Sequence, residues 1–448
     1  MVKDLTSGKP LKLILMFSLP LVLGNLFQQF YNMADTIIVG KCLGVNALAA
    51  VGSTGSLNFL VMGFATGICS GLTIPVAQYF GAKDEHNVRR CVANSLYVVL
   101  AITAVLTAAT MLFTRQILAL MQTPADIFED AYAYIIVIFG GMGVTLLYNL
   151  LSGILRALGD SRTPLYFLVV ASLLNVVLDL VFIQLFHTGV AGAAYATVIS
   201  QGVSALLCLV YMVRKFPLLR IRGKDWSLSG SHVRRMLGIG VPMGLQFSIT
   251  AVGSIILQSA VNSLGSSAVA AIAAGSKVQM LLTQPLETMG ITMATYCGQN
   301  MGAMRVDRIR QGIRQATWVS LAYSVLAFGI SFVAGKQIAL LFLDAGEVQI
   351  LNDVFRFLMV NGCFYPFLAL IYLYRNSLQG LGYAVPAMAA GIFELVGRAA
   401  VAFCLVGIWG YSAVCFANPA AWIAADILLL PVYFAVSRRL RAAYPAQA

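Results

Sequence analysis

The chain has 448 residues, of which 60% are hydrophobic and only 10% are charged, and its formal net charge is +12. A soluble globular protein carries about 25% charged residues, so this composition excludes a soluble fold and indicates a protein that crosses the membrane several times. The basic residues fall in short connections rather than on one soluble face, so no nucleic-acid partner is expected. The first apolar segment is too long for a signal peptide and should stay in the mature chain.

That first apolar segment, 13–40, contains two residues that are unusual in a membrane span. As a helix it would be about 42 Å long at about 1.5 Å per residue, enough to cross a hydrocarbon layer of about 30 Å. Pro20 removes a backbone hydrogen bond, which predicts a bend and makes this position a candidate hinge. Asp35 would bring a carboxylate to membrane depth, where an acid indicates a functional role.

Further apolar segments, separated by Gly, Pro or charged residues, predict twelve spanning helices in all. The expected ranges are 13–40, 47–79, 91–113, 129–155, 164–186, 190–213, 236–263, 268–299, 316–343, 352–379, 386–406 and 411–436. Their connections are alternately rich and poor in Lys and Arg. By the positive-inside rule, the rich side faces the cytoplasm. We therefore expect both termini in the cytoplasm and the protein in the inner or plasma membrane.

A basic linker, 214–235, divides the chain into an N-terminal half, 1–213, and a C-terminal half, 236–448. Each half contains six predicted spans. Because each half starts on the cytoplasmic side, the halves are expected to be parallel repeats related by an axis along the membrane normal. The predicted fold is therefore all-α and polytopic, with two six-helix lobes facing each other across a cleft.

The two halves also repeat short motifs. Pro20 occupies the place in the first half that Pro242 occupies in the second. The sequence Q-Y-F-G-A, which begins at Gln78, recurs as Q-N-M-G-A from Gln299. No P-loop, H-E-x-x-H or clear G-x-S-x-G motif is present, and the eight cysteines have no metal-binding spacing. We therefore expect neither an enzyme nor a bound cofactor.

Polar residues at membrane depth converge on one predicted site in the first lobe. Asn175 precedes Asp179 by four residues, so both lie on one face of the fifth span. Asp35 and Thr197 have a similar depth in the outer half of the membrane, and packing of their spans would complete an oxygen-rich pocket. Two neighbouring carboxylates in a low-dielectric site cannot both ionise cheaply, so a proton or Na⁺ would neutralise them.

The second lobe lacks this pocket. At the equivalent positions it has Leu257 for Asp35, Gly397 for Asn175 and Val401 for Asp179. A structural role should recur in both halves, whereas an ion site need not, so the asymmetry favours ion coupling. The alternative is that Asp35 extends to the outer interface and that Asp179 is a hydrogen-bonded packing residue.

The predicted substrate cleft is assigned to Glu287, Met289 and Met293 on the eighth span, with Gln28 on the first. Glu287 could meet a cationic substrate, and methionine walls suit varied ligands, although plain packing would also explain the methionines.

A second group of buried charges is predicted near the end of the chain. Glu394 and Arg398 are four residues apart on the eleventh span, and Asp426 has a similar depth on the twelfth. This predicts an internal charge-neutral cluster, with a role in gating as the alternative.

The chain resembles the multidrug and toxic compound extrusion (MATE) family. The resemblance rests on P-L-V-L-G-N and N-M-A-D-T-I-I-V-G in the first span, on Q-Y-F-G-A and G-Q-N-M-G-A, and on R-A-L-G-D-S-R-T-P after the fourth span. It implies a V-shaped antiporter that exports cationic or amphipathic organic compounds in exchange for H⁺ or Na⁺. It also implies that Asp35, Asn175, Asp179 and Thr197 line the cation site, with Tyr134 nearby.

One branch of the family carries additional acids in the second lobe. Here Thr250 stands in place of the first, and the tenth span has no acid between 357 and 374. This departure favours coupling through the first lobe.

The sequence thus predicts a secondary-active multidrug exporter that works as a monomer. A lipid or lipid-linked saccharide flippase is the alternative. It would need a more cationic cleft, to which the predicted spans contribute only Lys277 and Arg375.

Overall fold

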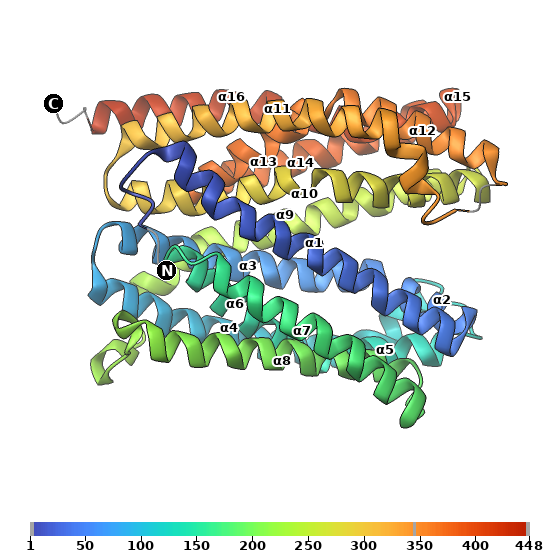
Figure 1. The fold of residues 1–448 in the computed structure, drawn as a ribbon, viewed down its shortest axis with the longest axis horizontal. Coiled ribbons are helices and arrows are strands. Elements are labelled where there is room, and N and C mark those ends of the chain that lie inside the picture. Colours follow the sequence, from blue (N-terminus) through green and yellow to red (C-terminus); the bar gives the residue numbers. More distant parts are fainter. Residues whose placement is uncertain (1–3, 344–345, 445–448) are drawn as a thin grey trace. The chain divides into compact units, whose positions relative to one another are not determined.

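The structure is a computed structural model that describes residues 4–343 and 346–444, and every regular element in this part of the chain is helical (Figure 1). Its packing divides the chain into two units. Unit 1 is Met1–Asp4 with Leu19–Gly244, and unit 2 is Leu5–Ser18 with Leu245–Ala448.

Two helices belong partly to each unit, namely α1 (Pro10–Leu43) and α9 (Gly230–Asn262). Unit 1 also contains α2 (Val45–Ser53), α3 (Gly55–Gly81), α4 (Glu85–Leu120), α5 (Phe128–Gly140), α6 (Met142–Ala157), α7 (Arg162–Leu180), the π-helix η1 (Val181–Leu185), α8 (Val190–Lys215) and the 3₁₀ turns η2 (Pro217–Leu219) and η3 (Gly223–Trp226). Unit 2 contains α10 (Ser266–Gly302), α11 (Val306–Ala339), α12 (Val348–Cys363), α13 (Tyr365–Gly380), α14 (Ala384–Ala400), the π-helix η4 (Val401–Leu405), α15 (Val406–Trp409) and α16 (Tyr411–Ala443).

Each predicted span corresponds to a helix or a helix pair. In the described residues, nine helices are long and apolar enough to cross a membrane, and eleven spans result if each of two bent pairs counts as one. The remaining predicted span, 268–299, forms α10, which is not among these candidates although it has 37 residues. Its buried face carries polar residues such as Thr288, Thr292 and Gln299. The all-α polytopic fold is thus confirmed.

The fourth span of each half is broken rather than continuous, which the sequence did not predict. The α5–α6 pair bends by 47° and the α12–α13 pair by 54°. At the first break, Gly141 lets α8 approach closely, because a Cβ atom there would clash with Val198 Cγ2. At the second break, Pro366 occupies the first turn of α13, where a proline favours a new helix start.

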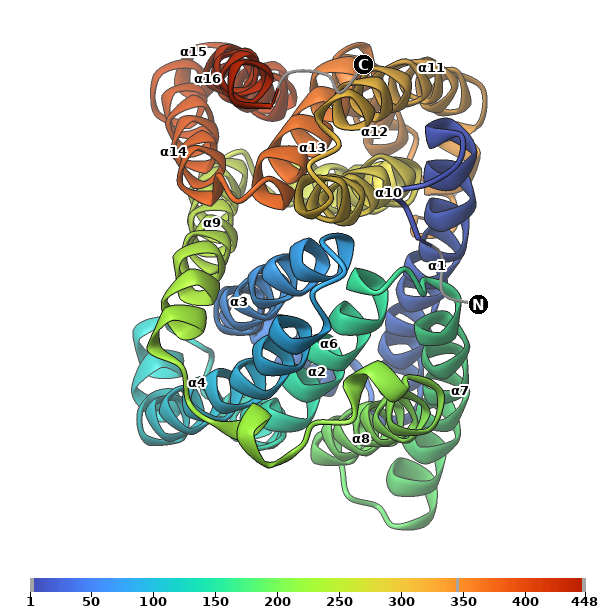
Figure 2. The same cartoon turned by 90° about the vertical axis from the view of Figure 1, so that its left-hand side faces the viewer.

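The helices of each unit pack side by side, as the end-on view shows for α7 and α8 in unit 1 (Figure 2). In unit 2 the closest neighbours are α14 with α16 and α10 with α13. The repeat equivalence places α14 and α16 of unit 2 where unit 1 has α7 and α8. In both units the first of these helices continues into a π-helix, η1 or η4. A π-turn inside an α-helix frequently marks a functional region.

The repeated Q-x-x-G-A motif has the same structural role in both halves. Gln299 Oε1 accepts a hydrogen bond from Leu5 N at 2.9 Å, which anchors the chain just before α1. In unit 1, Gln78 Oε1 accepts from Arg235 Nη2 at 2.7 Å, near the start of α9. Each motif therefore anchors the beginning of the other half's first helix.

Candidate functional site

The residues predicted to form a pocket in the first lobe converge within unit 1. The carboxyl groups of Asp35 on α1 and Asp179 on α7 lie within hydrogen-bonding reach of each other. Asp179 is fully buried, and Asp35 is half-buried. Packing of α1, α7 and α8, which the sequence argument had to assume, therefore brings the two acids together.

Asn175 connects Asp179 to α8. With its amide nitrogen toward the carboxylate, Asn175 donates to Asp179 Oδ2 at 3.0 Å, and its amide oxygen accepts from Thr197 N at 3.1 Å. This orientation satisfies both neighbours, whereas the reverse one would face oxygen to oxygen and nitrogen to nitrogen. The side chain of Asn175 is fully buried. It therefore fixes the distance between α7 and α8 as well as the orientation of the acid.

One oxygen of each acid has no donor. Asp35 Oδ1 and Asp179 Oδ1 are buried, and no hydrogen bond reaches either atom from the residues that the structure describes. Two carboxylate oxygens can bond to each other only through a shared proton or a bridging cation. The pair is therefore built to take up positive charge.

Two tyrosines complete the surroundings of the acid pair. Tyr134 on α5 was predicted to be near the site, and it lies close enough to Asp35 and Asp179 to interact electrostatically with both. Tyr31 on α1 was not predicted, yet its hydroxyl group is hydrogen-bonded to the side chain of Thr197. Its position four residues before Asp35, on the same helix face, is the pattern that could have revealed it.

An apolar cluster lies one helical turn beyond the site, on the side away from the basic linker. Val39 follows Asp35 by four residues, Ile183 follows Asp179 by four, and Ala193 precedes Thr197 by four. All three side chains are buried in a single hydrophobic cluster. The cluster therefore separates the acid pair from that end of unit 1.

In unit 2, the position equivalent to Asn175 is a glycine that packs against the backbone of a neighbouring helix. A Cβ atom on Gly397, which corresponds to Asn175, would lie 2.9 Å from Ala421 Cα on α16. Close helix packing thus replaces the polar contact that Asn175 makes in unit 1.

The charged residues predicted in the second lobe do cluster, with one addition. Arg375 Nη1 donates to Glu394 Oε1 at 2.7 Å, and Arg398 Nη2 lies 3.5 Å from Glu394 Oε2. Asp426 is buried near this network, but no hydrogen bond or ion pair reaches its carboxylate from the described residues. Arg375, considered for a cationic cleft, is instead only 8% exposed and is paired inside unit 2.

The structure does not bring all the predicted cleft residues together in one unit. Gln28 is half-buried in unit 1, whereas Glu287, Met289 and Met293 belong to α10 in unit 2. Met293 is fully buried and Met289 is 7% exposed. In the described part of the chain, no three His, Cys, Asp or Glu side chains converge on a possible metal position.

The predicted hinge coincides with a change of unit. Residues from Leu5 to Ser18 belong to unit 2 and the rest of α1, from Leu19, belongs to unit 1, so the boundary within α1 lies one residue before Pro20. In α9 the boundary follows Gly244, two residues after Pro242. The equivalent prolines therefore mark the equivalent transitions.

The helical fold and its two repeats define a multi-pass membrane protein. A family model described as MatE matches residues 20–181 and again 242–404, so each match begins at one of the two equivalent prolines. The chain belongs to the MatE family, as its motifs predicted. It is therefore a transport protein rather than an enzyme.

Known relatives agree with this assignment. The chain is 30% identical to the "Probable multidrug resistance protein YoeA" of Bacillus subtilis, over 94% of this chain and 92% of that protein. It is 23% identical to an "FAD transporter" of Shewanella oneidensis, over 86% of this chain and 85% of that one. A solved outward-facing multidrug resistance MATE transporter has a TM-score of 0.92 and 25% identity, with 98% of each chain covered.

Proposed function

We propose that this protein is a secondary-active multidrug exporter in which protons, entering through the acid pair of unit 1, drive the export of organic compounds. The observation that carries the proposal is the buried contact between Asp35 and Asp179, in which one oxygen of each acid lacks a donor. Family membership and the multidrug resistance relative support the transport class. Cationic or amphipathic compounds are the proposed cargo.

The orientation of Asn175 favours H⁺ over Na⁺ as the coupling ion. In the orientation that satisfies both neighbours, its amide nitrogen faces Asp179 and its oxygen accepts from Thr197 N. A sodium ion needs several oxygen ligands, and an amide that presents N–H to the site removes one of them. A proton needs only the two carboxyl groups.

The proposed cycle uses the charge of the acid pair as its switch. A proton taken up from outside neutralises the pair, which stabilises the conformation in which α1 bends at Pro20. Release of the proton to the cytoplasm restores the charge and the straight helix. The apolar cluster of Val39, Ile183 and Ala193 closes the outer approach to the acids, so proton entry requires this cluster to open.

The remaining assignments rest on the sequence pattern. The Lys and Arg distribution supports a cell membrane protein with both termini in the cytoplasm, and we propose that it works as a monomer. Glu287 on α10 is the proposed carboxylate for a cationic cargo, with Gln28, Met289 and Met293 as further contacts.

Proteoliposomes that contain the purified protein and ethidium test the proposal. We expect a pH gradient, acidic on the side from which protons enter, to drive ethidium movement, and a Na⁺ gradient of equal size to drive none. Transport with Na⁺ alone would contradict proton coupling. Movement of a fluorescent lipid without ethidium transport would instead favour the flippase alternative.

A further inference from the structure

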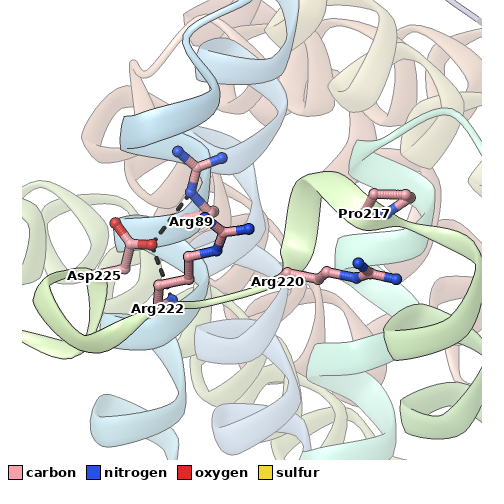
Figure 3. A pocket seen from close by; sticks show the side chains of 5 residues that line it. All are labelled: Arg89, Pro217, Arg220, Arg222 and Asp225. Carbon is pink, nitrogen blue, oxygen red and sulfur yellow. Dashed lines mark hydrogen bonds and ion pairs between the residues drawn. The ribbon is translucent and has the colours of Figure 1, made fainter.

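The linker between the two repeats forms a basic cavity on unit 1, next to the start of α4. We call it the linker cavity. It has a volume of about 240 Å³ and is lined by Arg89, Pro217, Arg220, Arg222 and Asp225. Figure 3 shows Asp225 at one end of this group and Pro217 with Arg220 at the other.

The charges in the linker cavity are not balanced. Asp225 is 7% exposed, and its Oδ2 atom lies 3.2 Å from Arg89 Nε and accepts from Arg222 N at 3.1 Å. These contacts hold the turn of η3 in place. Among the described residues no carboxylate lies within ion-pair distance of the guanidinium groups of Arg220 or Arg222. Arg89 is paired with Asp225 and also with Glu85, whose Oε2 atom lies 3.6 Å from Arg89 Nη1. The positive charges left for a ligand are therefore those of Arg220 and Arg222.

The residues beside the linker cavity are typical of the membrane interface. Trp226, next to Asp225, is 42% exposed, and Leu228 is 71% exposed. Tyr97 on the membrane helix α4 donates its hydroxyl hydrogen to Trp226 O at 3.1 Å, and the two rings meet edge to face. Trp and Tyr are enriched where lipid headgroups meet the hydrocarbon layer. An exposed Trp paired with a Tyr is therefore what a cavity at headgroup level would have beside it.

We propose that the linker cavity binds the phosphate of an anionic phospholipid. Arginine matches the geometry of phosphate oxygens through paired N–H donors, and Arg220 and Arg222 are available for this role. The exposed side chains of Trp226 and Leu228 would lie along the acyl chains. Free phosphate has the same charged oxygens, but it has no apolar part that could contact Trp226 and Leu228.

The experiment compares two double variants with equal loss of charge. Arg220→Gln/Arg222→Gln removes the free guanidinium groups, whereas Arg214→Gln/Lys215→Gln removes two exposed charges of the same linker outside the cavity. Each protein is placed in nanodiscs of neutral phosphatidylcholine with increasing phosphatidylglycerol, and thermal unfolding reports lipid binding. A parallel titration adds inorganic phosphate to discs without phosphatidylglycerol.

We expect Arg220→Gln/Arg222→Gln to weaken the apparent affinity for phosphatidylglycerol about tenfold, because the paired N–H donors of both guanidinium groups to one phosphate are lost. The control should change it about twofold or less. Unfolding in pure phosphatidylcholine should be the same for all three proteins, which shows that the variants fold. Equal losses in both variants, no response to phosphatidylglycerol, or equal stabilisation by inorganic phosphate would each overturn the proposal.

Discussion

With its amide nitrogen toward the carboxylate, Asn175 donates a hydrogen bond to Asp179 Oδ2 at 3.0 Å, while its oxygen accepts one from the backbone of α8. A single buried residue therefore supports the proposed proton site and holds two helices together. Its counterpart in unit 2 is a glycine, so the same position has a polar function in one repeat and a packing function in the other.

Replacement of Asn175 should impair transport more than folding. Asn175→Leu removes the donor to a buried carboxylate, a loss of about 1–3 kcal/mol, and we expect proton-driven efflux to fall about tenfold or more. Ser172→Ala, one turn earlier on α7, removes only a bond to Leu168 O and serves as the control. Efflux assays at matched protein levels decide the question. Equal efflux rates in wild type and Asn175→Leu would show that Asn175 is not part of the proton site.

The glycine of unit 2 should tolerate no side chain. In Gly397→Ala the new methyl group would meet the α16 backbone at 2.9 Å, so we expect a loss of about 1–3 kcal/mol of stability. Gly329→Ala, on α11, has open space around the new Cβ atom and should be neutral or stabilised by about 0.5–1 kcal/mol. Thermal unfolding in detergent measures both. The packing argument fails if the two variants unfold at the same temperature.

The hydrogen bond from Leu5 N to Gln299 Oε1, which holds the chain before α1, can be tested directly. Gln299 is fully buried, and Gln299→Leu leaves the Leu5 amide without its acceptor, which should cost about 1–3 kcal/mol. We expect faster proteolysis of the chain before α1, together with a lower unfolding temperature. Gln258→Leu, at an exposed position of α9, is the matched control. Unchanged proteolysis in Gln299→Leu would show that the motif does not hold this segment.

Asp84 should make the cap of α4 sensitive to acid. Its carboxylate accepts from the side chain and the backbone N–H of Asn87, and the side-chain bond in particular lowers the pKa of Asp84 below its usual value. A lowered folded-state pKa stabilises the protein above the unfolded pKa of about 3.9, and this contribution disappears as the pH falls through the folded pKa.

Asp84→Ala should therefore cost about 1 kcal/mol at pH about 7 and much less at pH about 3. The free energy of unfolding at the two pH values measures this difference. Asp307→Ala, in the first turn of α11, removes an acid that is not an N-cap residue and should show a smaller effect. A cost for Asp84→Ala that stays constant with pH would contradict the role of the charged cap.

Much of the fold follows from the sequence because apolar length and charge distribution determine where helices cross a membrane. The repeat could be detected from Pro20, Pro242 and the Q-x-x-G-A motifs, and the family model confirms it. The break at Gly141 could not be predicted, because it depends on which helix packs against that position. The break before α13 has a signal in Pro366 that was not used, because a proline is also found inside continuous helices such as α1. Helices α4 and α11 also begin earlier than predicted, since charged residues can extend a helix beyond the membrane.

The acid pair was predicted from spacing within one helix and from similar depth on different helices, whereas contacts that show neither signal were not predicted. The spacing of Asn175 and Asp179 placed both on one face of α7. Arg375 and Glu394 lie on different helices, so their ion pair could not be inferred from spacing. The roles of Met289 and Met293 stay a prediction, because a methionine pattern alone does not distinguish a binding wall from packing between helices.

The most direct test of proton coupling compares acids inside and outside the pair. Asp35→Asn and Asp179→Asn remove the exchangeable charge, whereas Glu129→Gln removes an exposed acid of unit 1 that pairs with Arg115. The measurement is ethidium efflux from proteoliposomes under an imposed pH gradient, with ethidium binding recorded separately. We expect both pair variants to lose pH-driven efflux while they still bind ethidium, and Glu129→Gln to match wild type. Full pH-driven efflux in either pair variant would contradict the account.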